Sequence, residues 1–190
     1  NAPINLMTRN GKRILRLVNQ LLDFRKIQNQ KMKLKIQEVE ICEFIKEICQ
    51  NFEQLSNQKR IDFTFPECKT KQFAWIDKEK MDSVLFNILS NAFKFTTNGK
   101  SINVTVENGP DFHSIIVKDQ GKGIPKEKLP LIFKRFNSLS TDNTNFSGTG
   151  IGLAYSDEII KLHEGELMVE STEGKGSTFT ILIPIGKKHF

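Results

Sequence analysis

The sequence lacks the features that would place it in a membrane or in a disulfide-stabilised scaffold. None of its apolar runs approaches the 18 residues that suggest a membrane-spanning helix. It contains only three cysteines, Cys42, Cys49 and Cys68, which form neither a CxxC motif nor a pattern with the histidines. An odd, sparse set of cysteines is more typical of a reducing compartment than of a disulfide framework. The seven-residue spacing of Cys42 and Cys49 predicts that both lie in the core, on one helix face.

Net positive charge is absent outside the N-terminal segment. The formal net charge is +6, but residues 1–35 hold nine basic residues and one acidic residue, which gives +8 for that segment. The other 155 residues hold 19 basic and 21 acidic residues, which gives −2. A nucleic-acid-binding domain would be expected to carry a basic surface, so we expect no nucleic acid partner. A basic N-terminal helix that binds acidic lipid or nucleic acid remains an alternative.

The periodicity of apolar residues divides the chain into an N-terminal helix and a mixed domain. Apolar residues recur at helical spacing over residues 4–28. They form two adjacent stripes that one helix cannot bury by itself, which predicts a helical bundle in a dimer. We therefore expect a helix in residues 1–30, a polar linker in residues 31–35 and one domain in residues 36–190.

The domain alternates between strand and helix patterns. Strand patterns cover residues 32–41, 61–65, 73–76, 101–108 and 113–119, and a hairpin closes the chain. Helical patterns cover residues 41–59, about 77–95 with Asp77 as N-cap, 129–136 and about 149–163. Strands mixed with helices in this order predict an α+β two-layer sandwich.

Two asparagines stand four residues apart in the helical stretch NILSNAFKFT, residues 87–96. Asn is a poor helix former because its amide competes for backbone hydrogen bonds. On a helix, Asn87, Asn91 and Lys94 fall within an arc of roughly 60°, beside the apolar face. This polar line at the edge of the core would suit a ligand cleft. The alternative is that the two amides only bind neighbouring backbone.

Two glycine-containing motifs follow. In SIIVKDQGKGIP, Asp119 ends a strand and precedes Gly121 and Gly123, so a carboxylate could accept an exocyclic amine while glycine backbone approaches a flat ring. An ordinary Asp-Gly turn would read the same way. In SGTGIGLA, residues 147–154, three glycines precede a helix, where backbone N–H groups and the helix dipole favour phosphate. Its spacing matches neither a Rossmann fingerprint nor a Walker A loop.

In this order, NILSNAFKFT, DQGKGIP, IFKRF and SGTGIGLA resemble the N, G1, F and G2 boxes of the sensor histidine kinases, whose ATP-binding domain belongs to the GHKL superfamily. GKGSTFTILIP is similar to that family's last strands, and ILRLVNQLLDFRKI to the second helix of its dimerisation and phosphoacceptor hairpin. The resemblance implies an α+β two-layer sandwich, with a mixed sheet, helices on one face and a long N-terminal helix before it. It also implies an ATP lid over about residues 121–148.

The resemblance further implies roles for single residues. Asn91 would ligate Mg²⁺ on the ATP phosphates, with Asn87 as second choice. Lys94 would neutralise phosphate charge, and Arg135 would reach the γ-phosphate when the lid closes. Asp119 would accept the adenine amine, supported by Thr178. The other ATP-binding residues that the resemblance implies are Phe95 near the adenine, Gly121, Gly123, Ile124, Gly148, Thr149, Gly150, Gly152 and Leu153.

Two further features bear on the activity. The ATPases of the superfamily carry a Glu as general base where this chain has Asn87, and an amide cannot take a proton, which favours a kinase over an ATPase switch. None of His113, His163 and His189 has the context of a phosphoacceptor, so we expect the acceptor to lie outside this chain and His163 to be structural. A non-catalytic nucleotide-binding or dimerisation module remains an alternative.

The resemblance implies partners and a location as well. The intact protein would form a homodimer through the N-terminal helix and would pass phosphate to the receiver domain of a response regulator. The chain would be a cytoplasmic domain, and any membrane anchor of its parent would lie in regions outside this sequence.

Overall fold

The computed structural model of the chain describes residues 11, 15, 18–69, 71–135 and 150–186. The chain divides into two compact units, Asn1–Lys33 and Leu34–Phe190. In the first unit, residues 18–28 are helical, and Gln30 with φ of 53° follows the end of this helix. Among the described residues of this unit, the exposed large apolar side chains are Leu15, Val18, Leu21 and Leu22, which are 46–61% exposed. None of the helices in the described part of the chain is both long and apolar enough to cross a membrane.

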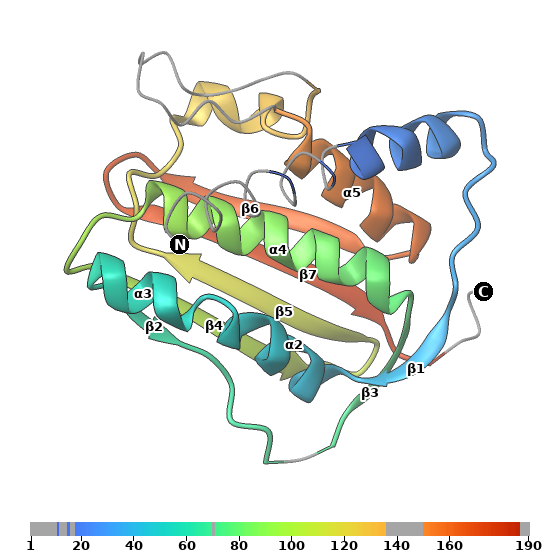
Figure 1. Cartoon of the computed structure of the whole chain (residues 1–190), viewed down its shortest axis with the longest axis horizontal. Coiled ribbons are helices and arrows are strands. Elements are labelled where there is room, and N and C mark those ends of the chain that lie inside the picture. Colours follow the sequence, from blue (N-terminus) through green and yellow to red (C-terminus); the bar gives the residue numbers. More distant parts are fainter. Residues whose placement is uncertain (1–10, 12–14, 16–17, 70, 136–149, 187–190) are drawn as a thin grey trace. The chain divides into compact units, whose positions relative to one another are not determined.

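The second unit is built on a five-stranded mixed sheet (Figure 1). Its strands are β2 (Asp62–Thr64), β4 (Ser101–Asn108), β5 (Phe112–Asp119), β6 (Glu166–Thr172) and β7 (Gly176–Pro184). Their order is β2-β4-β5-β7-β6, with β2 parallel to β4 and the other neighbours antiparallel. A separate antiparallel pair joins β1 (Gln37–Glu40) to β3 (Phe73–Ile76).

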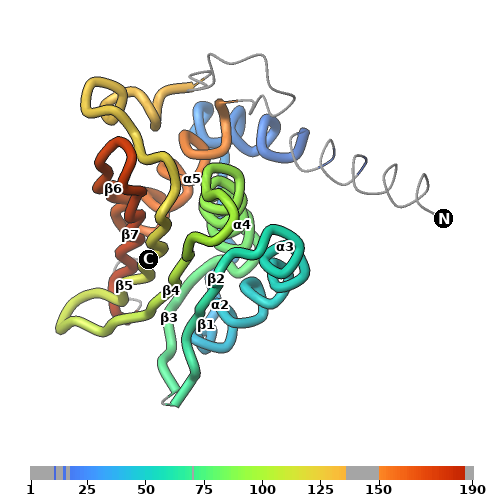
Figure 2. Tube along the Cα trace, turned by 90° about the vertical axis from the view of Figure 1, so that its left-hand side faces the viewer, coloured from blue at the N-terminus to red at the C-terminus, as the bar shows by residue number. Residues whose placement is uncertain are grey.

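Four α-helices cover one face of this sheet (Figure 2). They are α2 (Ile41–Gln50), α3 (Glu53–Lys59), α4 (Lys78–Phe95) and α5 (Gly152–Leu162). Burial alternates along the central strand β5, where Ile115, Val117 and Asp119 are buried while Phe112 and Lys118 are exposed. One apolar sheet face against a layer of helices is an α+β two-layer sandwich, which confirms the predicted fold class.

Three predicted elements were wrong in extent. Strand β1 begins only at Gln37, because residues 31–36 pair with no other strand in the described structure. The helix predicted over residues 41–59 is broken into α2 and α3 at Phe52, whose buried ring stacks on Phe93 at 5.2 Å between centroids. The helix predicted over residues 129–136 is instead a 3₁₀ helix, η1 (Lys126–Leu131), which contains Pro130.

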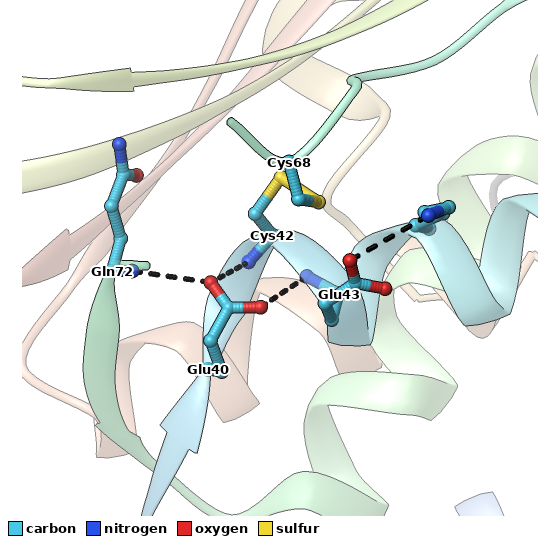
Figure 3. The surroundings of a disulfide bond; sticks show 6 residues. Glu40, Cys42, Glu43, Cys68 and Gln72 are labelled. Atoms are coloured by element: carbon cyan, nitrogen blue, oxygen red, sulfur yellow. Dashed lines mark hydrogen bonds and ion pairs between the residues drawn. A yellow bond between two sulfur atoms is a disulfide. The ribbon is translucent and has the colours of Figure 1, made fainter. Parts of the chain in front are cut away.

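A disulfide joins Cys42, in the first turn of α2, to Cys68, in the segment between β2 and β3 (Figure 3). The buried positions of Cys42 and Cys49 confirm the predicted core location, and burial raises the pKa of the free Cys49 thiol to about 12. The cysteine pattern, which is more typical of a reducing compartment, did not predict this disulfide. The pair lies 26 residues apart and is brought together because β1 and β3 pair, which spacing alone does not reveal.

The disulfide lies beside a compact helix cap. Glu40 is the N-cap of α2, and its carboxylate accepts hydrogen bonds from the backbone N–H groups of Cys42 at 3.3 Å and Glu43 at 2.6 Å. The same carboxylate accepts a hydrogen bond from the N–H of Gln72 at 3.1 Å (Figure 3). One side chain therefore binds both the first turn of α2 and the residue that precedes β3. A carboxylate at a helix N-terminus is also favoured by the helix dipole.

Candidate functional site

Helix α4 carries the predicted polar line. Its N-cap is Asp77, whose Oδ1 accepts a hydrogen bond from the N–H of Lys80 at 3.1 Å, as the sequence predicts. One face of α4 is buried in the core, while Asn87, Asn91 and Lys94 are half-buried. The polar line therefore does lie at the edge of the core, where a bound molecule can reach it.

Asn87 connects α4 to the start of α5. Its Nδ2 donates to the carbonyl oxygen of Gly152 at 3.1 Å and to Oγ of Ser156 at 3.3 Å. Ser156 Oγ donates to the same carbonyl at 2.9 Å. A side chain at Gly152 would meet Asn87 Cγ at 3.4 Å, so a glycine allows the close approach. The structure thus brings the first predicted asparagine together with the glycine-rich motif.

The rest of that motif is described only in part. Gly150 has φ of 66°, a backbone conformation that favours glycine, and Leu153 is half-buried in the first turn of α5. Gly148 and Thr149 lie outside the described residues. Arg135 is exposed, four residues after the end of η1 and next to the segment 136–149, which is also outside the described residues.

Asp119 ends β5 inside the sandwich. It is buried, and its Oδ1 accepts a hydrogen bond from the N–H of Gly121 at 2.8 Å. Burial raises the pKa of this carboxyl group above its ordinary value, and hydrogen bonds from the backbone of Gly121 and Ser177 partly offset that rise. A buried carboxylate with few protein donors is suited to accept an amine from a ligand.

The glycines after Asp119 are required by close packing against protein backbone. A Cβ at Gly121 would lie 2.7 Å from the carbonyl oxygen of Phe95. Gly123 has φ of 66°, and a Cβ there would collide with the carbonyl of Thr172. Ile124, which follows, is buried, and its N–H donates to Ser171 Oγ at 2.8 Å. These glycines therefore fix the course of the chain between α4 and the β6–β7 hairpin.

The structure does not bring Thr178 to Asp119. In the register of β5 and β7, Asp119 faces Ser177 and Lys118 faces Thr178. Because side chains alternate along a strand, Thr178 lies on the other face of the sheet, and the buried Ser177 shares the face of Asp119. Sequence reasoning missed Ser177, although counting back in steps of two from the apolar residues Phe179 and Ile181 would have found it.

The ammonium groups of two lysines lie close to the ring of Phe95. Lys94 Nζ lies 4.8 Å from the ring centroid, and Lys122 Nζ lies 4.9 Å from the same centroid. Such distances are typical of cation–π contacts. Phe95 and Lys94 were predicted from the N box, whereas Lys122, between the two glycines of the G1 box, was not.

No cluster of three or more His, Cys, Asp or Glu side chains that could hold a metal occurs in the part of the chain that the structure describes. Mg²⁺ often keeps most of its waters and uses one or two protein oxygens together with nucleotide phosphates. The half-buried amide of Asn91 fits that donor set.

One cavity lies away from these residues. It measures about 570 Å³ and is lined by residues of α2, the start of α4 and the segment around Lys35. It contains none of the predicted site residues. This cavity is an open groove lined by both acidic and basic side chains.

The chain is similar in sequence to one family of ATPases and to several histidine kinases. Residues 76–187 match the family described as histidine kinase-, DNA gyrase B-, and HSP90-like ATPase. The hybrid signal transduction histidine kinase D of Dictyostelium discoideum is 33% identical over 189 residues, which is 96% of this chain and 12% of that protein. The sensor histidine kinase WalK of Bacillus subtilis is 32% identical over 188 residues, 96% of this chain and 31% of that protein.

Solved structures agree in fold. The catalytic domain of histidine kinase ThkA, in a nucleotide-free form, has a TM-score of 0.70 and 28% identity, covering 80% of this chain and 98% of that chain. The histidine kinase AdeS of Acinetobacter baumannii has a TM-score of 0.74 and 21% identity, covering 97% and 84% respectively. The family match includes α4, Asp119 and α5 with the elements between them. The chain therefore belongs to the histidine kinase-, DNA gyrase B- and HSP90-like ATPase family and carries its ATP-binding domain.

Proposed function

We propose that this chain is the catalytic, ATP-binding part of a sensor histidine kinase. It would bind MgATP and transfer the γ-phosphoryl group to a histidine outside this sequence, for onward transfer to an aspartate of a response regulator. The names of the relatives support this proposal, although the chain spans only 12% and 31% of their lengths. The observation that carries it is the residue at position 87.

Asn87 stands where the water-activating ATPases of the superfamily have a glutamate. Its amide nitrogen donates hydrogen bonds to Gly152 and Ser156, and an amide has no site that takes up a proton at neutral pH. The chain therefore lacks a general base for water at this position. That favours transfer of the phosphoryl group to a protein side chain over hydrolysis.

The other residues would hold and orient the nucleotide. Mg²⁺ would supply charge neutralisation on the phosphates when bound, held by Asn91 with Asn87 as second choice. Asp119 would accept the adenine amine, with the hydroxyl of Ser177 beside it in place of Thr178. Lys94 and Arg135 would stabilise phosphate charge. Backbone of the loop before α5, at Gly148, Thr149, Gly150, Gly152 and Leu153, would face the phosphates.

The described histidines are not available as phosphoacceptors. His113 is 5% exposed, with Nδ1 2.6 Å from Asn108 Oδ1 and Nε2 3.1 Å from the carbonyl oxygen of Phe73. His163 is fully buried, and both of its ring nitrogens have backbone partners. Neither is therefore the acceptor in this proposal, and His189 lies outside the described residues but lacks the sequence context of an acceptor. We propose that the acceptor histidine lies on a segment or polypeptide outside this sequence.

We further propose the domain roles that the sequence suggests. Residues 1–30 would form the second helix of a dimerisation hairpin, 31–35 a linker, and 36–190 the catalytic domain, acting in the cytoplasm. The exposed leucines of the N-terminal helix would lie in a homodimer interface, and the receiver domain of a response regulator would be the second partner.

The test is a transfer assay with a separate acceptor hairpin. The chain is mixed with a polypeptide that contains such a hairpin and with γ-labelled MgATP, and phosphohistidine is measured. An acceptor whose histidine is replaced by alanine is the control. We expect label on the intact acceptor only. Binding of MgATP without any phosphohistidine would instead favour the non-catalytic module, and steady phosphate release that is lost in Asn87→Ala would favour an ATPase switch.

A further inference from the structure

Lys122 lies in the glycine-rich turn after β5 and is not explained by the roles assigned above. This turn passes between the end of α4 and the β6–β7 hairpin (Figure 1). The side chain is exposed, yet its ammonium group lies 4.9 Å from the centroid of the Phe95 ring. Lys94 Nζ lies 4.8 Å from the same centroid. Two lysines from different parts of the chain thus converge on one ring.

The backbone holds Lys122 in this place. Its N–H donates to the carbonyl oxygen of Phe95 at 3.2 Å, and its own carbonyl accepts from the N–H of Gly174 at 2.7 Å. The neighbouring Gly121 leaves no room for a side chain against Phe95. The position of the Lys122 Cα relative to α4 is therefore fixed, although its side chain is exposed.

The arrangement gathers positive charge without an acidic partner for Lys122. No carboxylate lies within ion-pair distance of Lys122 among the residues that the structure describes. Two ammonium groups near one ring repel each other, and one cation is enough for a cation–π contact. A polyanion between or beside them would relieve this repulsion.

We propose that Lys122 is a second phosphate-binding cation of the nucleotide site, acting together with Lys94 on the polyphosphate chain of ATP. This inference rests on the proposed function in two respects, that the domain binds ATP and that Lys94 acts on its phosphates. The contribution of Lys122 is electrostatic, so it increases with the number of phosphates on the ligand and decreases with ionic strength.

The test measures the affinities of ATP, ADP and adenosine for Lys122→Gln by calorimetry at low and at physiological salt. Lys118→Gln is the matched control, because it removes the same charge from an exposed position at the end of β5, on the sheet face opposite Asp119. We expect Lys122→Gln to weaken ATP binding roughly five-fold at low salt, ADP binding less, and adenosine binding not at all. Lys122→Arg should retain most of the affinity, and Lys118→Gln should bind all three ligands normally.

Two results would overturn the inference while leaving the proposed function intact. Unchanged ATP affinity in Lys122→Gln would show that the ammonium group contacts no phosphate. An equal loss for ATP and adenosine would show that Lys122 only covers the Phe95 ring. Failure of the unmodified chain to bind ATP would instead overturn the proposed function, and this inference with it.

Discussion

Helices α4 and α5 are joined by hydrogen bonds at two places that differ in burial. At one end, the N–H of Asp77 donates to His163 Nε2 at 3.0 Å, and His163 Nδ1 lies 2.8 Å from the carbonyl oxygen of Ile159. Asp77 is 4% exposed and His163 is fully buried. At the other end, Asn87 donates to Gly152 and Ser156 and remains half-buried.

We propose that the difference separates a structural contact from a functional one. Both nitrogens of the fully buried His163 ring bind protein backbone, so we assign this contact to holding the two helices together. The Asn87 contact lies where α4 meets the glycine-rich start of α5, at the edge of the core, so a ligand can compete for the amide. Changes at the first contact should therefore reduce stability, and changes at the second should reduce nucleotide binding.

The largest effect is expected for His163→Ala. The substitution leaves a cavity and an unsatisfied buried N–H at Asp77, and it should lower the free energy of unfolding by about 4 kcal/mol. Chemical denaturation measures this, and ATP affinity measured on the folded protein should be unchanged. Normal stability together with weakened ATP binding would reverse the distinction between the two contacts.

The next largest effect is expected for loss of the disulfide, which should change stability and not nucleotide binding. Cys42 and Cys68 are separated by 26 positions in the sequence, so loss of the disulfide should cost about 3 kcal/mol by loop-closure entropy. Reduction should lower the Tm of the unmodified protein to that of Cys68→Ser, whose Tm should not respond to reductant. A reductant effect of equal size in both proteins would show that the bond is not the cause.

Asn91→Ala tests the half-buried region around the Asn87 contact, since Asn91 lies one helical turn after Asn87. It should weaken MgATP binding about tenfold, or 1.4 kcal/mol, because an amide oxygen for the metal is lost. Stability should change little, since the side chain is half-buried. Binding of ATP measured in the presence of a chelator is the control. Equal losses with and without Mg²⁺ would exclude the role as metal ligand.

The smallest effect concerns Asp119 and has the opposite sign in stability. Burial raises the pKa of this carboxyl group in the folded protein, so the folded state keeps the proton to higher pH than the unfolded chain does. The free energy of unfolding therefore falls as pH rises from the ordinary carboxyl pKa through the raised one. Asp119→Asn does not titrate, so at neutral pH it should be more stable, by on the order of 1 kcal/mol, while binding adenine nucleotides more weakly.

Denaturation of both proteins across the acidic pH range provides the check. The stability difference should grow as pH rises through that window and then remain constant. A difference that does not vary with pH would show that the ionised carboxylate is not the source of the cost. Unchanged nucleotide affinity would contradict the assigned contact with adenine.

Local sequence signals predicted those parts of the fold that depend on neighbouring residues. The N-cap at Asp77 and the apolar face of α4 set that helix within one residue of its observed bounds. The break at Phe52 was missed because it depends on stacking against Phe93, which is distant in sequence. The disulfide was missed for the same reason, since the β1–β3 pairing brings Cys68 to Cys42.

The candidate site shows the same limit. The positions of Asn87, Asn91 and Lys94 on one line follow from helix geometry alone. The choice between Ser177 and Thr178 depends on strand register, and a shift of one residue moves a side chain to the other face. Lys122 could not be found from sequence, because its contact with the Phe95 ring depends on how the G1 turn packs on α4.

The most direct measurement of the difference between the two contacts is an NMR titration of the protein with MgATP. The side-chain amide signal of Asn87 should shift on binding, because nucleotide or metal replaces Gly152 and Ser156 as its neighbour. The ring signals of His163 and the backbone amide of Asp77 should shift much less. Saturating MgATP that leaves the Asn87 side-chain signal unmoved would contradict the account.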